Sequence, residues 1–390
     1  MLTAITNVNI YAPEFLDNQS VVVFDQTGIK HVGVDIPDHL DVKLYIDGSG
    51  CSLTPGLIDS HVHITMDPDP DPWPKLQESD AMISLRGAKN ALQSLRAGFT
   101  TLRDMGAKNH VDIALRNAIR QGLVPGPRLL VSGKCLCMTG GHGWMMGREV
   151  DSPDEARKGA REQLKATADV IKIMATGGVM TPGVEPGAAQ LTYEEMAAAV
   201  SEAVKAGKKT ATHAQGSTGI RNAVLAGISS VEHGFYLTEE ICDLMRQRGT
   251  FLVATLAAPH WIIEHGESAG IPAWAVEKAR HSSAAHVESF RLAMREGVPI
   301  AMGTDAGTPF NAHGKNAFEL ELMVRYGMSP SDALASATVR AAELLGLADI
   351  GRIATGMAAD MILVEGDPIE DIRLLQSSIR TVIKNGTIIT

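Results

Sequence analysis

Two histidines stand two residues apart near the end of an apolar stretch, in the segment His61-Val62-His63. In a β-strand, residues two apart point to the same side, so both imidazoles would face one point. Imidazole is a common ligand of zinc and similar divalent metals. The pair alone is weak evidence, and it predicts a metal site only if further ligands converge on it.

Four more residues of metal-binding type lie in or at the end of later apolar stretches. They are Lys172 within Val170–Ala175, His213 at the end of Lys209–His213, His233 at the end of Ser229–His233, and Asp305 directly after Pro299–Thr304. If these stretches are parallel strands of one barrel, their carboxyl ends meet at one mouth. A single buried histidine is usually an ordinary core residue. Five strands that carry such residues at the same end instead predict a metal centre.

Lys172 is the unusual member of this set, because an ammonium group does not bind a cation. At about 4 Å from a divalent ion it would be repelled by about 8 kcal/mol at an effective dielectric constant of about 20. The side chain must therefore be neutral or chemically altered. An amine that has taken up carbon dioxide becomes a carbamate, and this anion has two oxygens that can bridge two metals.

The elements that must position these residues alternate between strand and helix. The expected strands are Leu57–Ile64, Thr100–Met105, Arg128–Ser132, Val170–Ala175, Lys209–His213, Ser229–His233, Phe251–Thr255 and Pro299–Thr304. Helical patterns separate them and follow the last one. Eight such units predict an α/β fold, a (β/α)8 TIM barrel over residues 57–354. A doubly wound open sheet is the alternative.

Both ends of the chain have a different texture. Residues 1–56 contain short β-branched stretches with polar breaks, and residues 355–390 contain Ala359–Glu365 and a hairpin pattern around Asn385-Gly386. We therefore expect one small β-sandwich domain formed by both termini.

Composition excludes several classes of function. The formal net charge is −10, with 35 Lys and Arg against 45 Asp and Glu, and no basic run is present. Nucleic-acid and membrane-surface binding are therefore not expected. Four cysteines are too few for a disulfide scaffold, and neither a signal peptide nor a membrane span is recognisable, so the cytoplasm is the expected compartment. The expected partner is a small-molecule substrate, and a homo-oligomer is left open.

Together these motifs resemble the amidohydrolase superfamily, in its binuclear form with a carboxylated lysine. The matching segments are Pro55–His63, Lys172, His213, Val231–Gly234, Gly303–Asp305, Gly356–Asp360 and Lys384–Gly386. The resemblance covers nearly the whole chain. It implies two divalent ions, with zinc the first choice, and a carbon dioxide-derived carbamate on Lys172. By the same resemblance His61, His63 and Asp305 hold one ion, His213 and His233 hold the other, and Lys172 bridges them.

Within that superfamily the chain looks most like the imidazolonepropionase-like branch with metal-dependent dipeptidases of the Xaa-Pro dipeptidase or Xaa-Arg carboxypeptidase kind. The segments Thr139–Gly143 and Ile171–Gly178 carry this likeness, which implies that His142 contacts the substrate. Imidazolonepropionase itself is mononuclear, so Lys172 argues against that activity. Some dipeptidases of the branch have a carbonyl-polarising tyrosine where this chain has Gln215, and Tyr236 is a possible substitute.

The expected reaction is hydrolysis of an amide or peptide C–N bond. The resemblance implies that a metal-bridging hydroxide attacks the carbonyl, while Asp305 acts as the general acid/base. The expected substrate is a dipeptide or an N-acyl amino acid with a free carboxylate. One alternative is a deaminase or cyclic-amide hydrolase of the same superfamily, since fold does not fix the substrate. A second alternative is a non-catalytic metal-binding barrel.

Overall fold

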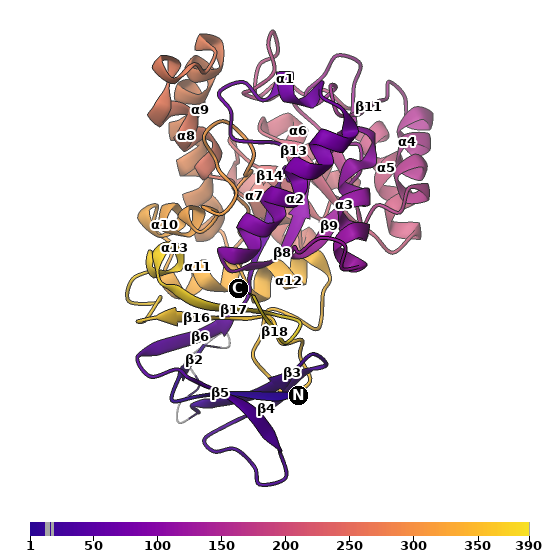
Figure 1. The fold of residues 1–390 in the computed structure, drawn as a ribbon. Coiled ribbons are helices and arrows are strands. Elements are labelled where there is room, and N and C mark those ends of the chain that lie inside the picture. Colours follow the sequence, from indigo (N-terminus) through magenta and orange to yellow (C-terminus); the bar gives the residue numbers. More distant parts are fainter. Residues whose placement is uncertain (12–15, 17–18, 390) are drawn as a thin grey trace.

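The computed structural model describes residues 1–11, 16 and 19–389. An α/β part forms one end of the molecule, and a smaller β-rich part built from both ends of the chain forms the other (Figure 1). In the part of the chain that the structure describes, no helix is long and apolar enough to cross a membrane.

The α/β part contains two parallel sheets. The first has the strand order β7-β8-β9 and the second the order β11-β10-β12-β13-β14-β15. The strands are β7 (Leu57–Val62), β8 (Phe99–Asp104), β9 (Arg128–Val131), β10 (Leu136–Cys137), β11 (Arg148–Glu149), β12 (Val170–Met174), β13 (Lys209–Ala214), β14 (Ser230–His233) and β15 (Phe251–Val253). Met174 pairs with His213, and Ala214 pairs with His233, so the register brings the carboxyl ends of three strands to one level.

The predicted eighth strand, Pro299–Thr304, is not a regular strand in the structure. Its backbone bonds are divided between two neighbours: the Leu252 amide donates to the Pro299 carbonyl (2.8 Å), and the Ser60 amide donates to the Met302 carbonyl (2.9 Å). The Met302 amide bonds to the Ser336 carbonyl (2.9 Å) outside the sheet, so that only isolated bridges form to each neighbour. The segment nevertheless lies between β15 and β7, as the sequence predicts, and it presents Asp305 at the strand ends.

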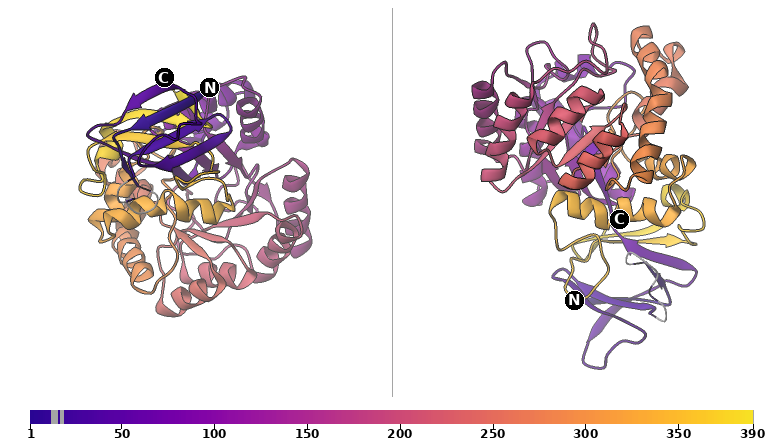
Figure 2. Two further views of the ribbon diagram at one scale, coloured as in Figure 1. Left: turned by 90° about the horizontal axis from the view of Figure 1, so that it is seen from below. Right: turned by 180° about the vertical axis from the view of Figure 1, so that it is seen from behind.

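Helices follow most of the strands and surround the sheets (Figure 2). They are α1 (Trp73–Leu76), α2 (Asp80–Arg96), α3 (Val111–Arg120), α4 (Pro153–Lys165), α5 (Tyr193–Lys205), α6 (Ser217–Ala226), α7 (Glu239–Arg248), α8 (Ala257–His265), α9 (Ala273–Arg295), α10 (Phe318–Arg325), α11 (Pro330–Ser336) and α12 (Val339–Leu345). Local sequence sets several of their starts. Thr192 forms a capping box with Glu195 at α5, and Ser152 caps α4 ahead of Pro153.

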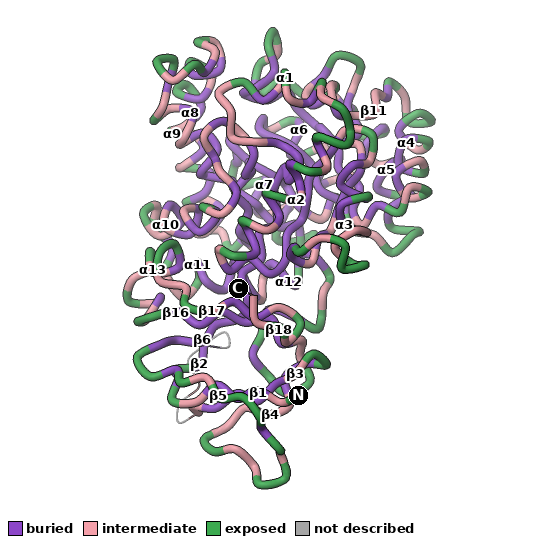
Figure 3. The backbone as a smooth tube through the Cα atoms, viewed as in Figure 1, coloured by how far each residue is buried: buried purple, intermediate pink, exposed green. Residues whose placement is uncertain are grey.

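The central strands are buried, and exposure is confined mainly to helix surfaces and loops (Figure 3). Every residue of β7, β8, β12 and β14 is buried. This explains the near-continuous apolar runs in the sequence, because a parallel sheet covered by helices meets no water on either face. The few polar residues in these runs, Lys172 among them, therefore lie inside the protein.

The β-rich part consists of two sheets with the orders β4-β3-β1-β5 and β18-β17-β16-β6-β2. Their strands are β1 (Leu2–Thr6), β2 (Asn9–Ile10), β3 (Val21–Asp25), β4 (Gly28–Gly33), β5 (Val42–Asp47), β6 (Cys51–Pro55), β16 (Met361–Glu365), β17 (Ile379–Lys384) and β18 (Thr387–Ile389), and a short helix, α13 (Leu374–Ser377), precedes β17. Residues of both sheets, such as Phe24 and Leu363, share one hydrophobic cluster. The predicted hairpin is confirmed, with Asn385 and Gly386 both at positive φ in the turn.

Candidate active site

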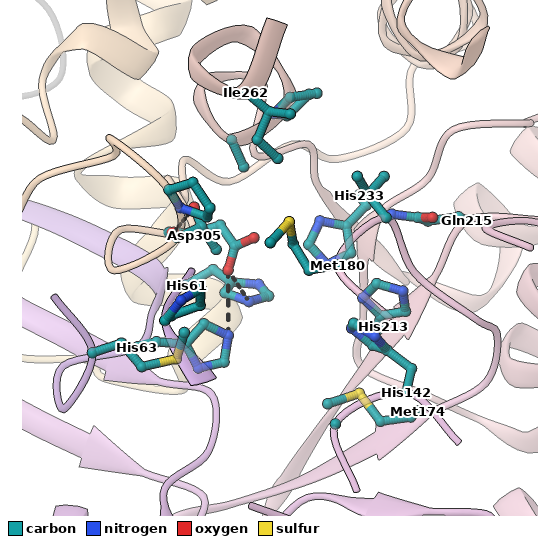
Figure 4. A pocket seen from close by; sticks show the side chains of 18 of the residues that line it. His61, His63, His142, Met174, Met180, His213, Gln215, His233, Ile262 and Asp305 are labelled. Carbon is teal, nitrogen blue, oxygen red and sulfur yellow. Dashed lines mark hydrogen bonds and ion pairs between the residues drawn. The ribbon is translucent and has the colours of Figure 1, made fainter. Parts of the chain in front are cut away.

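Three of the predicted ligands meet at the end of β7. The Nε2 atoms of His61 and His63 each lie 3.3 Å from Oδ1 of Asp305 (Figure 4). The same oxygen is therefore shared by two imidazoles that leave the strand on one side, as the spacing predicts. His61, His233 and Asp305 also place one nitrogen or oxygen atom each within 4.8 Å of one another, close enough for a common cation.

The other predicted ligands complete the ring. The His213 and His233 imidazole centroids lie 4.4 Å apart, and those of His61 and His233 lie 5.2 Å apart. Lys172 is 1 % exposed and lines the same pocket as these histidines. The structure thus brings together all six residues that the sequence predicts as metal ligands.

Hydrogen bonds fix the orientation of three rings. His61 Nδ1 lies 2.7 Å from Glu232 Oε2, His233 Nδ1 lies 2.7 Å from Thr255 Oγ1, and His213 Nε2 lies 3.0 Å from the Gly177 carbonyl. In each ring the second nitrogen is left for another partner. This is the usual arrangement around metal-binding histidines, because the outer hydrogen bond selects the tautomer and holds the ring.

Glu232 is a site residue that the sequence reasoning missed. Its side chain is fully buried and accepts a hydrogen bond from Arg103 at 3.0 Å on the oxygen not used by His61. Burial would raise the pKa of Glu232, but the Arg103 guanidinium and the bond to His61 outweigh it and hold that pKa below its ordinary value. The sequence contained one signal that could have identified this pair: Glu232 and Arg103 are charged residues that each lie within a predicted strand, and both strands are buried throughout.

The donor set fits divalent metal ions. Lys172 Nζ is buried and makes no hydrogen bond within the described residues, while His61 Nε2 and Asp305 Oδ1, 3.3 Å apart, contact each other without forming a regular hydrogen bond. Buried polar atoms are nearly always satisfied, so an unsatisfied atom of this kind indicates a missing partner. Nitrogen and carboxylate donors are also the ligand types that zinc and its neighbours bind.

The protonation states agree with this interpretation. Burial holds the pKa of His213 and of His233 well below the ordinary value, so both rings are neutral at pH 7 and can offer a lone pair. Burial also lowers the pKa of Lys172 to about 8. At pH 7 about a tenth of such a lysine is neutral, far more than for an ordinary lysine, and the neutral amine is the form that reacts with carbon dioxide.

Two site residues have unusual backbone conformations. His233 has a φ of 74° and Asp305 a φ of 61°, and neither is glycine. This left-handed conformation costs of the order of 1 kcal/mol or more per residue and is concentrated at functional sites. Since strand alternation does not hold through such residues, side-chain directions at these strand ends could not be taken from the sequence alone.

The pocket around these residues has a volume of about 760 Å³, counting the space open to solvent. His142 and Gln215 line it, as predicted, and the His142 ring lies 4.1 Å from that of His213, centroid to centroid. Tyr236 is 36 % exposed, its ring faces Gly187, and it is not among the described residues that line the pocket. Of the two candidates for polarising a carbonyl, only Gln215 therefore reaches this pocket.

The pattern of the amidohydrolase family matches residues 52–389 of the chain, which includes every residue of the site. The chain belongs to the amidohydrolase family. This confirms the resemblance seen in the motifs at the strand ends.

Three amidohydrolase relatives are especially informative. Ochratoxinase from Aspergillus niger is 31 % identical over 93 % of this chain and 80 % of its own length. The structure of an Xaa-Pro dipeptidase with methionine bound in its active site is 33 % identical, with a TM-score of 0.90 and full coverage of both chains. A prolidase in complex with N-methylphosphonate-L-proline is 29 % identical, with a TM-score of 0.93 and full coverage of both chains.

These similarities establish the class of reaction. This amidohydrolase is an enzyme, a hydrolase that acts on C–N bonds. The alternative of a non-catalytic metal-binding barrel is therefore wrong. The likeness extends over the whole length of the dipeptidase chains, which is the branch that the motifs indicated.

Proposed function

We propose that this amidohydrolase is a metal-dependent enzyme that cleaves the amide bond of a dipeptide or an N-acyl amino acid with a free carboxylate. The observation that carries the proposal is the convergence of His61, His63, Lys172, His213, His233 and Asp305 in one pocket, where the buried Lys172 Nζ has no hydrogen-bond partner among the described residues. The prolidase, the Xaa-Pro dipeptidase and ochratoxinase among the relatives support the substrate class.

The metal-binding roles are those that the family resemblance implies. His61, His63 and Asp305 would hold one divalent ion, and His213 and His233 a second. Lys172 would bridge the two as a carbamate, formed when its neutral amine adds to carbon dioxide and loses a proton. Zinc is the first choice for such ligands, and the bound ions would supply Lewis-acid polarisation of the carbonyl and activation of water.

Asp305 is placed to move the proton. Burial would raise its pKa, but His61 and His63 hold that pKa well below the ordinary value, so the group is a carboxylate. It accepts a proton from the water that adds to the carbonyl carbon, and it delivers that proton to the amide nitrogen as the C–N bond breaks. The products are a carboxylic acid and an amine.

His142 is placed to bind the substrate carboxylate. Its Nδ1 lies 2.6 Å from Thr181 Oγ1, and burial lowers its pKa to about 3, so the ring is neutral. When the Thr181 hydroxyl donates this bond, the ring proton is on Nε2 and is available to a carboxylate. Gly140 and Gly143 flank this residue at positive φ, which shapes the loop that carries the imidazole.

His142→Ala is expected to lower kcat/KM for substrates with a free carboxylate by about 10²-fold, through loss of one hydrogen bond to a charged group. Both metals should be retained, because His142 is outside the proposed ligand set. The measurement is steady-state kinetics of wild type and variant on a matched acid and C-terminal amide. Equal cleavage of acid and amide by the wild-type enzyme would refute carboxylate recognition.

The proposal extends to the architecture. The two parallel sheets, joined by the segment 299–306, would form one closed (β/α)8 barrel over residues 57–354. A backbone bond from the Asp169 amide to the Val131 carbonyl (2.8 Å) would bridge the gap between β9 and β12. The terminal segments 1–56 and 355–390 would form the small β-sandwich, which is supported by the hydrophobic cluster that their sheets share.

A further inference from the structure

We infer that the substrate is an N-acyl amino acid whose acyl group is apolar and uncharged, and not a free dipeptide. The inference rests on the proposed function and selects between its two substrate classes. The two classes differ in one group, because a dipeptide carries an α-ammonium next to the scissile carbonyl and an N-acyl amino acid does not. The pocket must therefore contain a counter-charge for that group if dipeptides are the substrate.

No such counter-charge is available among the described residues that line the pocket. The pocket has a single carboxylate there, Asp305, and both His61 and His63 already lie 3.3 Å from its Oδ1. The cation in the lining is Lys172, which would repel an ammonium unless it is carboxylated. A carboxylated Lys172 would have its charge committed to the metals.

Two acidic residues near the pocket, Asp67 and Glu232, are engaged elsewhere. Asp67 forms ion pairs with Lys75, Arg86 and Lys89, at 2.8–3.2 Å. The carboxylate of Glu232 is fully buried and is held by Arg103 and His61. Each of these acids is already neutralised by its own partners, so neither provides a free charge for an incoming ammonium.

The pocket walls are instead apolar. They include Met66, Trp73, Met180, Phe235 and Ile262. Methionine and aromatic side chains fit apolar groups of varied shape. An ammonium moved from water against such walls loses most of its hydration, and the Gln215 amide oxygen that lines the pocket carries no full charge to replace it, whereas an acyl chain gains from burial.

The arrangement also indicates where the acyl group lies. In Figure 4, His142 and Ile262 lie at opposite ends of the pocket, with Asp305 and His233 between them. A substrate whose carboxylate binds His142 and whose amide lies at Asp305 would therefore extend its acyl group towards Ile262. Ile262, in α8, is 3 % exposed and belongs to a cluster with Val179, Met180 and Phe235.

The test compares two substrates that differ only in the α-amino group, 3-phenylpropanoyl-L-leucine and L-phenylalanyl-L-leucine. The same pairs are made with phenylalanine and proline as the released amino acid. For the zinc-loaded wild-type enzyme at pH 7, kcat/KM should be at least about tenfold higher for the acyl compounds, because only about a tenth of the dipeptide amine is uncharged at that pH. The ratio of acyl to dipeptide kcat/KM should fall above the α-amine pKa of about 8, because the dipeptide then loses the positive charge of its α-ammonium group.

A matched pair of variants tests the role of charge directly. Ile262→Glu introduces a carboxylate at the acyl end, and Ile262→Gln introduces similar polarity and size without charge. The ratio of acyl to dipeptide kcat/KM should be about tenfold lower in the Glu variant than in the Gln variant. An equal ratio in the two variants, each confirmed as folded by circular dichroism, would overturn the explanation by charge.

The two proposals fail in different ways. Equal cleavage of both members of a pair, or preference for the dipeptide, would overturn the inference and leave the proposed function standing. If a zinc-loaded enzyme cleaves neither member of any pair, the proposed substrate class itself is wrong, and the inference falls with it.

Discussion

Replacing Asp305 with asparagine is expected to lower kcat by at least about 10³-fold, because the amide can neither accept a proton from water nor deliver one to the leaving nitrogen. Asparagine has the same shape, so the fold should be retained. The measurement is kcat on an N-acyl amino acid, with circular dichroism and metal content determined on the same preparation. Asp71→Asn is the matched control, since Asp71 is exposed and its bond from the Trp73 amide can be kept by asparagine.

Two results would contradict this assignment. A folded Asp305→Asn variant that keeps its metals and more than about one tenth of wild-type kcat would exclude a proton-transfer role for this carboxylate. A loss of equal size in Asp71→Asn would show that the effect is not specific to the pocket.

Lys172→Met is expected to remove most of the bound metal and abolish turnover, since methionine has a similar length but cannot form a carbamate. The side chain is buried in an apolar strand, and burial already lowers the pKa of its ammonium to about 8. The variant should therefore be at least as stable to heat as the metal-free wild-type enzyme. Elemental analysis, thermal unfolding and kinetics of both proteins measure these three quantities.

The carbamate is tested separately in the wild-type enzyme. After metal and bicarbonate are removed, zinc restored in degassed buffer should recover little activity, and added bicarbonate should recover the rest. Full recovery without carbon dioxide, or a Lys172→Met variant that retains two metals, would show that Lys172 is not a bridging ligand.

The sequence predicts much of this site because parallel strands impose a simple rule. A polar residue near the carboxyl end of a buried strand lies at the mouth of the sheet, so His61, Lys172, His213, His233 and Asp305 could be grouped without coordinates. The rule depends on an apolar run being a strand buried on both faces. It is satisfied here because β7, β12 and β14 are completely buried.

Other features of the site depend on contacts between distant segments. Glu232 reaches His61 across 171 residues of sequence, and it is matched by Arg103 from a third strand. No local pattern specifies such a network. The walls of the pocket also come from loops and α8, where Met180 and Ile262 have no periodicity that would distinguish a binding surface from an ordinary core.

The segment predicted as the eighth strand shows a further limit of prediction from the sequence. An apolar run predicts a strand at Pro299–Thr304, but the segment makes only isolated bridges to β15 and β7, the Met302 amide bonds to Ser336 instead, and Asp305 follows at a positive φ. The position of the carboxylate was predictable from the order of the segments. Its backbone conformation was not, because it depends on bonds to His61 and its neighbours.

A metal titration followed in parallel by bound metal and by activity tests the central claim most directly. Metal-free enzyme is titrated with zinc in the presence of bicarbonate. Each point is assayed for metal by elemental analysis and for hydrolysis of an N-acyl amino acid by release of free amine.

The six proposed ligands are more than a single catalytic zinc needs, because such an ion uses three protein ligands. The account predicts that activity is absent without metal and that both curves level off near two equivalents per chain. A plateau of both at one equivalent, or hydrolysis by the metal-free enzyme, would contradict it.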